Sequence, residues 1–197
     1  ISNISGIWDI KPVNKNENIL IQGDYNGLSV LEKTDNSWKL KNKITGLNIS
    51  SNQFEIFRDS LIFVNHEIDG LYKLTVNADF THITKFKIEN SVPRGLKTGL
   101  IKFDNNLIYA TPQGVYEYNS RNDIFVKDTL LSQNLFEKDG FASGKLIPEA
   151  HENAIWAFTD KNLVRLVKGN LNNSMRPERF PISAKSRDFV KGYENMY

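Results

Sequence analysis

The residues best able to support catalysis or metal binding are the three histidines, His66, His82 and His151. No two of them lie two or four residues apart, and no His-Glu-x-x-His motif occurs. A mononuclear metal site would therefore have to be assembled from segments far apart in the sequence. The chain contains no cysteine, which excludes disulfides, cysteine-ligated zinc and cysteine nucleophiles. The adjacent pair His66 and Glu67 is the one local hint of acid–base chemistry.

Motifs for cofactors and nucleotides are absent from the sequence. There is no P-loop, no G-x-G-x-x-G and no G-x-S-x-G. Segments 24–27 and 67–70 resemble a calcium loop faintly, but they lack its ligand density and its distal Glu. We therefore expect no metal and no cofactor. Lys and Arg number 25 against 23 Asp and Glu, a net charge of +2. So small a charge predicts no nucleic-acid partner for this chain.

An internal repeat organises the chain. Four segments each contain two short apolar runs, with a Gly or an Asn just before the second run. These four anchor residues are Gly27, Gly70, Gly114 and Asn162. They lie 43, 44 and 48 residues apart, and a period of about 40–50 residues built from strands is typical of β-propeller blades. We interpret the anchors as turn positions with positive φ, which Gly adopts without strain and Asn tolerates.

Each repeat also has an earlier and a later strand candidate, which completes the four strands of a propeller blade. The candidates for the first strand are 7–10, 54–57, 100–103 and 145–147, and those for the fourth are 38–40, 84–88, 124–126 and 178–182. Helical patterns are weak throughout, and segment 128–139 is predicted to be a loop because it lacks a sustained 3.6-residue period.

These patterns predict an all-β fold: a β-propeller of about four four-stranded antiparallel blades, part of a larger ring of seven or eight. The predicted blades span residues 1–48, 49–92, 93–137 and 138–183, and residues 184–197 start a further blade or form a linker. The alternative is a β-sandwich whose repeat spacing arose by chance. In a partial ring the first and last blades expose apolar faces, which a second copy (a homodimer) or the remaining blades would cover.

The fourth repeat resembles a known family. Its residues Trp156, Thr159 and Leu163 fall on positions of the two-component regulator propeller repeat, whereas Ala154 and Asn162 replace glycines of that repeat. Segment 190–196 is similar to a stretch in bacterial sensor proteins that carry this propeller. In that family a triple-tyrosine β-sandwich, a membrane helix and a histidine kinase or LuxR-type module follow. The resemblance implies a periplasmic or otherwise extracytoplasmic sensory propeller in a membrane-anchored parent protein.

Ligands of propellers usually meet the face that carries the loops between the second and third strands and the connections between blades. The residues predicted on this face, and taken as candidates for contact with a ligand or partner, are Asp24, Tyr25, Asn26, His66, Glu67, Arg94, Gln113, Asp160 and Lys161. The connections add Ser51, Asn52, Lys97 and Lys138. No catalytic or metal-binding residue is assigned.

The leading functional hypothesis is a non-catalytic sensory or interaction propeller. Its partner would be a small molecule, a glycan or another protein. One alternative is a propeller enzyme, a lyase or a glycosidase, which needs converging carboxylates or a His–Glu pair near the axis. Another is a carbohydrate-binding propeller with one site per blade, although the loops differ in residue type from blade to blade.

The aromatic residues are expected mostly in the core between blades. Trp8, Trp38 and Trp156 lie in or beside predicted strands, so we expect them to be structural. Tyr25 differs because it lies in a turn between two polar residues. An aromatic residue in a turn is more often a contact residue than a core residue.

Overall fold

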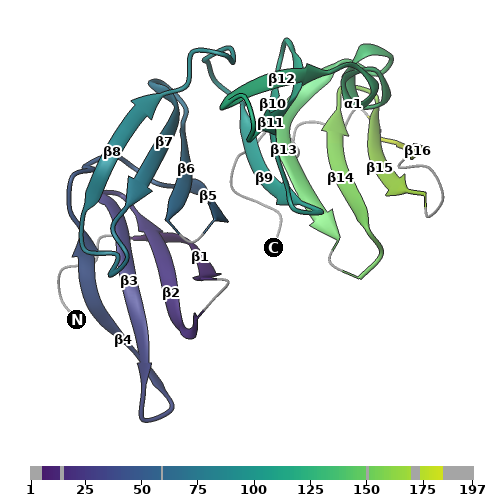
Figure 1. The fold of residues 1–197 in the computed structure, drawn as a ribbon. Helices are drawn as coiled ribbons and strands as arrows, with labels where there is room; N and C mark the ends of the chain where they lie inside the picture. The colour runs from purple at the N-terminus through teal and green to yellow at the C-terminus, as the bar shows by residue number, and fades with distance from the viewer. Residues whose placement is uncertain (1–5, 14–15, 59, 150, 170–173, 184–197) are drawn as a thin grey trace. The chain divides into compact units, whose positions relative to one another are not determined.

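The computed structural model describes residues 6–13, 16–58, 60–149, 151–169 and 174–183, and in these the strands form four antiparallel four-stranded sheets (Figure 1). Strand order within each sheet follows chain order, and we number the sheets blades 1 to 4. Residues 184–197, predicted to start a further blade, and the family-like segment 190–196 lie outside the described residues. Among the described residues, no helix is both long and apolar enough to cross a membrane.

The chain divides into two compact units, Ile1–Arg94 and Gly95–Tyr197, each with two blades. Blade 1 contains β1 (Ile7–Val13), β2 (Asn16–Asp24), β3 (Gly27–Thr34) and β4 (Ser37–Ile44). Blade 2 contains β5 (Gln53–Arg58), β6 (Leu61–His66), β7 (Gly70–Val76) and β8 (Ile83–Ile88). The first unit thus holds two complete four-stranded sheets.

The second unit repeats this plan. Blade 3 contains β9 (Gly99–Phe103), β10 (Asn106–Thr111), β11 (Gly114–Asn119) and β12 (Ile124–Asp128). Blade 4 contains β13 (Phe141–Glu149), β14 (Ala154–Thr159), β15 (Asn162–Lys168) and β16 (Met175–Pro181). The predicted all-β class with four four-stranded antiparallel blades is confirmed.

The four anchor residues occupy equivalent positions, because Gly27, Gly70, Gly114 and Asn162 each begin the third strand of their blade. The three glycines have φ of +130°, +101° and +133°, as the turn argument requires. Asn162 does not have positive φ, so that explanation is wrong for blade 4. The hydroxyl of Thr159 stabilises the turn there instead, by accepting a hydrogen bond from Asn162 N at 2.9 Å.

Segment 128–139 contains α1 (Thr129–Ser132) and a π-helical turn (Gln133–Glu137), so the prediction of a loop is wrong. The carboxylate of Asp128 caps α1 by accepting a hydrogen bond from Leu131 N at 2.9 Å. Leu131 and Leu135 are buried in the core of the second unit. Their spacing of four residues is the helical signal present in the sequence.

Each unit has one hydrophobic core between its two blades. The alternation of buried and exposed residues along the strands places one apolar face of each sheet against its neighbour. In the first unit the fully buried core includes Ile21, Leu28, Ile44, Ile62 and Leu74. In the second unit the buried core includes Ile155, Ala157, Val164 and Leu166 of blade 4, packed with Val115 of blade 3 and with Leu135.

The blades of one unit approach so closely that backbone meets backbone. A Cβ on Gly23 of β2 would fall far inside van der Waals contact with the carbonyl oxygen of Ser51, in the connection to blade 2. In the second unit, a Cβ on Gly99 of β9 would overlap the carbonyl oxygen of Gly144 of β13. Hydrogen bonds fix both approaches: Ser51 N donates to Asp24 O at 2.9 Å, and Gly144 N donates to Lys97 O at 2.6 Å.

Blades 1 and 2 are also joined at the inner and outer ends of their sheets. At the innermost strands, the ammonium of Lys11 lies 3.2 Å from Asp9 and 3.1 Å from Glu55. Burial acts to lower the pKa of Lys11, but the two carboxylates outweigh it, so that pKa is raised. At the outer end, a parallel bridge pairs Thr45 with His82, which ties the chain after β4 to the chain before β8.

The outermost strands of blades 1 and 2 are rich in lysine. β4 contributes Lys39, Lys41 and Lys43, and β8 contributes Lys85 and Lys87, all of them exposed. Lys41 pairs with Glu32 at 2.8 Å and Lys87 with Glu89 at 2.9 Å. β4 also exposes Trp38 and Leu40, and β8 exposes Phe86, so these edge strands are of mixed character, in contrast to the apolar second and third strands inside each sheet.

We predict that Gly23→Ala and Gly144→Ala each lower the free energy of unfolding of their own unit by about 1–3 kcal/mol, as overpacking does. The added methyl group meets backbone atoms, which cannot move aside as a side chain can. Urea unfolding followed by circular dichroism measures the change. Gly95→Ala gives the cost of backbone strain alone for comparison, because φ is +146° there but no atom lies within 4 Å of the added Cβ. Wild-type stability for Gly23→Ala or Gly144→Ala would contradict the steric explanation.

Candidate functional site

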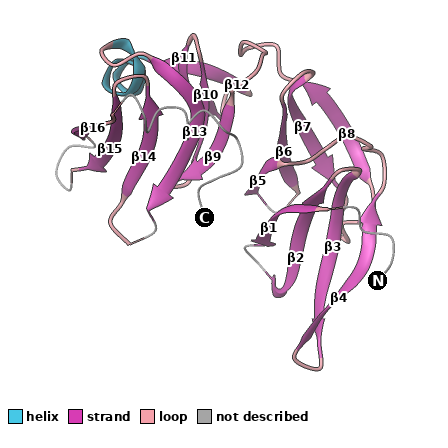
Figure 2. Cartoon of the chain, turned by 180° about the vertical axis from the view of Figure 1, so that it is seen from behind, coloured by secondary structure: helices cyan, strands magenta, loops and turns pink. Residues whose placement is uncertain are grey.

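In every blade a short loop joins the second and third strands, and loops are pink in Figure 2. The four loops share one construction. Each second strand ends on a residue whose side chain hydrogen-bonds to the hairpin that follows. These strand-ending residues are Asp24, His66, Thr111 and Thr159. Two of them, Asp24 and His66, were predicted as ligand-contact candidates from the sequence. In the structure both have a structural partner within their own hairpin.

In blade 1 the buried carboxylate of Asp24 shapes the two-residue turn Tyr25 and Asn26. Its Oδ1 accepts a hydrogen bond from Asn26 N at 2.6 Å, and its Oδ2 accepts one from the hydroxyl of Ser29 at 3.1 Å. Both carboxylate oxygens of Asp24 therefore have a partner inside the blade. The exposed residues of this hairpin are Tyr25 and Asn26.

In blades 3 and 4 a threonine hydroxyl, in place of a carboxylate, hydrogen-bonds to the backbone of the hairpin. Thr111 Oγ1 accepts from Gln113 N at 3.1 Å and donates to Gly114 O at 3.2 Å. Thr159 Oγ1 accepts from Asn162 N and donates to Asn162 O at 2.7 Å. Sequence reasoning missed this role for both threonines, although all four strand-ending residues align in the repeat and all can accept a hydrogen bond.

In blade 2 the partner of His66 is Asp69, not the adjacent Glu67. Nδ1 of His66 accepts a hydrogen bond from Asp69 N at 3.2 Å and lies 3.1 Å from Asp69 Oδ2. The hydroxyl of Tyr72 also hydrogen-bonds to Asp69. Burial and then this carboxylate raise the pKa of Tyr72, while nearby Arg94 opposes them.

The remaining candidates lie on loops or blade connections. Arg94 packs its side chain over Gly70 and donates to Asn90 Oδ1 at 2.8 Å, so it lies beside the His66 hairpin. In blade 4 the ammonium of Lys161 donates to Lys138 O at 3.2 Å, and the side chain of Asp160 packs on Gly140. The structure therefore groups Arg94 with the blade 2 hairpin and Lys161 with the connection before blade 4. Gln113 is exposed in the blade 3 hairpin.

An exposed pair of aromatic rings lies beside the blade 1 hairpin. The rings of Trp8 and Tyr25 have centroids 4.7 Å apart at an interplanar angle of 60°. Their exposed fractions are 44% and 51%, so the prediction of a core role is wrong for Trp8. It is wrong for Trp38 also, which is 42% exposed on the edge strand β4. Gly6 packs against the ring of Tyr25, since a Cβ there would overlap its ring carbons. We call Gly6, Trp8 and Tyr25 the aromatic ledge.

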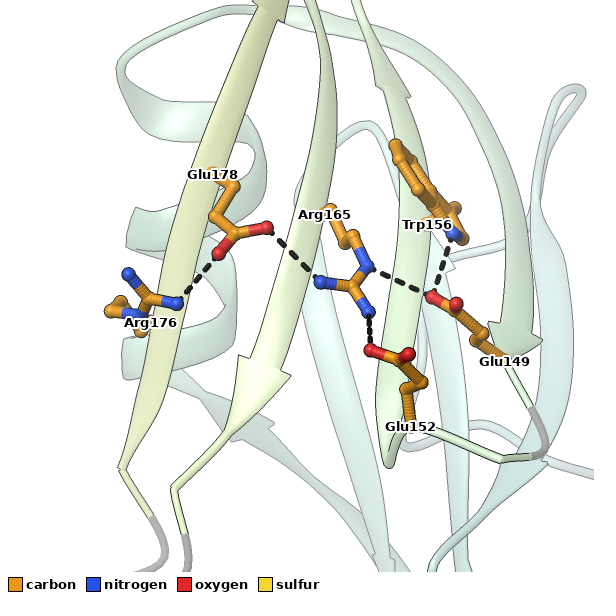
Figure 3. A network of polar contacts seen from close by, with 6 residues as sticks. All are labelled: Glu149, Glu152, Trp156, Arg165, Arg176 and Glu178. Carbon is orange, nitrogen blue, oxygen red and sulfur yellow. Dashed lines mark hydrogen bonds and ion pairs between the residues drawn. The ribbon is translucent and has the colours of Figure 1, made fainter.

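Blade 4 contains a network centred on Arg165 (Figure 3). The guanidinium contacts three carboxylates: Glu149 at 2.9 Å, Glu152 at 2.6 Å and Glu178 at 3.1 Å. The indole N–H of Trp156 donates to Glu149 at 3.0 Å. Strand register creates this arrangement, because Arg165 on β15 lies opposite Trp156 on β14 and opposite Glu178 on β16.

The groups of this network bind one another, so the network stabilises the fold of blade 4. The hydrogen bond from Arg165, and then its charge, lower the pKa of Glu149 despite desolvation, and the same contacts raise the pKa of Arg165. Each of the three guanidinium nitrogens of Arg165 is bound to a carboxylate. Trp156, on a family-like position of the sequence, is half-buried and packs near Phe180, with ring centroids 5.6 Å apart.

Two further features of the described residues bear on the site. Among the described residues, no group of three or more His, Asp or Glu could hold a metal ion. An open groove of about 420 Å³ lies on blade 3, lined in part by Glu117, Asp128 and Leu130. Burial, and then the charge of Asp128, raise the pKa of Glu117. None of the residues predicted as contact candidates lines this groove.

Comparison with solved structures identifies the fold. The chain matches the extracellular domain of the hybrid two-component system BT3049 from Bacteroides thetaiotaomicron at 16% identity and a TM-score of 0.56, over 90% of this chain and 22% of that one. It matches an auxiliary nutrient-binding protein from Bacteroides thetaiotaomicron at 11% identity and a TM-score of 0.56, over 89% and 42%. The WD40 β-propeller domain of Doa1 matches at 11% identity and a TM-score of 0.52, over 81% and 50%.

The chain folds as blades of a β-propeller. It spans half or less of the length of the solved structures it matches, so a partial propeller fits. Identities of 11–16% show the fold alone. No family model matches the sequence, and no curated protein does.

We predict that Thr159→Val lowers the free energy of unfolding of the second unit by about 1–2 kcal/mol, because a buried hydroxyl loses two hydrogen bonds. Valine keeps the shape of the side chain. Thr84→Val in blade 2 is the control, since its exposed hydroxyl makes one hydrogen bond, to Thr75 O. Urea titration of both variants makes the comparison. A cost for Thr159→Val no greater than that of the control would refute the hairpin role.

The Arg165 network predicts acid sensitivity of the second unit. A carboxyl whose pKa is lowered by folding stabilises the fold above its unfolded pKa, and the effect is lost as pH falls through the folded pKa. Because the pKa of Glu149 is lowered from 4.5, Tm should fall as pH drops from about 6 to about 3. Arg165→Gln should flatten this dependence, whereas Arg121→Gln, on an exposed turn, should leave it unchanged. Thermal melts across this pH range test the claim, and parallel curves for wild type and Arg165→Gln would contradict it.

Proposed function

We propose that this chain is part of a non-catalytic ligand-sensing propeller located outside the cytoplasm. The observation that carries the proposal is the construction of the hairpins. In every blade, the residue that ends the second strand fixes the backbone of the loop that follows. The exposed residues of those loops, such as Tyr25 and Lys161, are thereby presented on a rigid support. Preorganised loops on a rigid scaffold are the usual place for recognition residues.

A binding role suits the chemistry better than catalysis. A general base needs a ring nitrogen or carboxylate directed at a substrate, yet Nδ1 of His66 is engaged by Asp69 of its own hairpin. Arg165 is held by three glutamates, so it is not free to stabilise a developing negative charge. The polar groups around His66 and around Arg165 are thus bound to one another and stabilise the fold.

A sensory role is supported by similarity to solved structures and to a repeat motif. Two of the matching structures are the extracellular domain of a hybrid two-component system and a nutrient-binding protein. The residues Trp156, Thr159 and Leu163 agree with the two-component regulator propeller repeat. On this proposal the parent protein is a membrane-anchored signal-transduction regulator, and its signal is a small molecule, a glycan or a protein.

The second candidate is a propeller enzyme, a lyase or a glycosidase. The observation in its favour is the contact of His66 with Asp69, since a carboxylate beside one ring nitrogen orients the other toward a substrate. On this reading Nδ1 of His66 would have to donate to the carboxylate of Asp69 instead of accepting from Asp69 N, which would leave Nε2 unprotonated as the general base.

One experiment separates the two candidates. The purified chain is screened by thermal shift against a library of metabolites and oligosaccharides, and each hit is recovered and analysed by mass spectrometry. We expect saturable stabilisation by at least one ligand, which is recovered unchanged. A product that forms with wild type and not with His66→Gln would establish the enzyme instead. Absence of any stabilising ligand would refute a small-molecule or glycan signal.

A further inference from the structure

We propose that the outward face of blade 1 binds the outward face of blade 4 of a second copy of this chain, head to tail. The outward face of a blade is the one turned away from the core of its own unit. The inference concerns an interaction surface, so it goes beyond the ligand-sensing proposal and does not depend on it. Two copies joined by two such contacts supply eight blades, within the range of about 4–8 found in closed propellers.

The outward face of blade 1 carries an apolar row that crosses all four strands. The core residues Ile19, Ile21 and Val30 point toward blade 2, so their neighbours in the same strands point outward. Strand register then places one outward residue of each strand in line, and these residues are Pro12, Leu20, Leu31 and Leu40. Leu40 is 52% exposed, and Ile10 beside the row is 43% exposed. Blade 1 is therefore apolar on both faces, as a blade between two neighbours is.

A buried amide on the same side of blade 1 lacks a hydrogen-bond partner. Gln22 alternates with the core residues of β2 and lies opposite Ile10 and Ser29 in the register. It is 1% exposed, yet its Nε2 has no partner among the described residues. Buried polar groups nearly always have a partner, because an unpaired donor loses its bonds to water and gains nothing in return. An acceptor supplied by a second molecule would remove this cost.

The outward face of blade 4 has a matching apolar row. The core residues Ala157 and Val164 point toward blade 3, so the residues on either side of them point outward. Register aligns three of these outward residues across β14, β15 and β16, namely Phe158, Leu163 and Phe180. Phe180 is 47% exposed. Two sheets that each present an apolar row can pack face to face, as the two blades of one unit do.

Charge complements the apolar rows. On blade 1, Lys33 and Lys43 are exposed and have no ion pair among the described residues, while Asp24 on that side is buried with both oxygens bound. On blade 4, the network of Arg165 lies on the outward face and contains three glutamates against two arginines (Figure 3). Its most exposed carboxylate is that of Glu152, at 62%. The lysines of one copy can therefore pair with the surplus carboxylate of the other.

These features favour a second copy, arranged head to tail, as the occupant. A contact between two blade 1 faces would set the lysines of one copy against those of the other, which is unfavourable. A contact between blade 1 and blade 4 instead brings opposite charges together. The chain spans half or less of the length of the propellers it matches, so two copies approach the length of one closed ring.

Sedimentation velocity and light scattering of the purified chain measure its oligomeric state, and we expect a dimer. The double variant Ile10→Ser with Leu40→Ser changes blade 1, and Phe180→Ser changes blade 4. Each should raise the dissociation constant of the dimer about tenfold or more, as at an interface hot spot. Phe86→Ser is the matched control, because Phe86 is 63% exposed on β8 of blade 2 and belongs to neither face. It should leave the dimer unchanged.

A mixture of the blade 1 variant and the blade 4 variant tests the head-to-tail arrangement. A mixed pair retains one wild-type contact, so mixed dimers should form although neither variant associates alone. A dimer that survives in either variant alone would overturn the arrangement. Should a serine variant fail to fold, two surface variants replace them: Lys33→Glu with Lys43→Glu on blade 1, and Glu152→Lys on blade 4. Each should weaken the dimer alone, and mixing the two should restore it.

Gln22→Met tests the unpaired amide, because methionine keeps the length of the side chain without its polar group. It should raise the Tm of the monomeric blade 1 variant and weaken the dimer of the otherwise wild-type chain about threefold to tenfold. An unchanged dimer would overturn the role of Gln22. A folded chain that stays monomeric at about 100 μM would overturn the whole proposal and leave further blades of a longer polypeptide as the cover of this face. The ligand-sensing proposal would stand in that case, since its own test is ligand binding.

Discussion

In each unit the two blades meet backbone to backbone at a glycine, and no side chain fits between them there. Gly23 lets the chain at Ser51 approach blade 1, and Gly99 and Gly144 meet without side chains between them. Two twisted sheets normally stand about 10 Å apart, with side chains between them. Where they converge, one strand must lack a Cβ. Glycine is therefore required at these places for close approach, independently of any turn.

One residue, Asp24, connects this contact between blades to the exposed hairpin of blade 1. The carbonyl of Asp24 accepts the hydrogen bond from Ser51 that ties the blades together, at 2.9 Å. The carboxylate of the same residue holds the turn that carries Tyr25. Packing between blades and presentation of the aromatic ledge therefore depend on the same short stretch of β2. A change that pushed the blades apart at Gly23 would move the ledge as well.

The sequence predicted the fold because its signals are local. Glycine at the start of the third strand, in three of the blades, and alternation within strands both act over a few residues, and both recur along the repeat. The Arg165 network was missed because it depends on which residues face one another across three strands, and register is not visible in one strand alone. The exposure of Trp8 and Trp38 was missed for a related reason: an aromatic residue in a strand is core only where another sheet covers it. Asp24 and His66 were correctly placed at hairpins, but the partners of their side chains follow from loop geometry that residue type does not specify.

The lysines of β4 and β8 affect whether further strands can pair with the outer edges of blades 1 and 2. β4 and β8 present free backbone groups along their outer edges, and an apolar edge there would pair with the edge of any other sheet. Lys39, Lys41, Lys85 and Lys87 place charged side chains along these edges, two of them paired with glutamates, and the bridge between Thr45 and His82 pairs the chain just beyond the two strands. Strand addition at the outer edge, the route to fibrils, would have to desolvate these charges. New blades can be added by stacking face to face, while the width of each blade stays fixed at four strands.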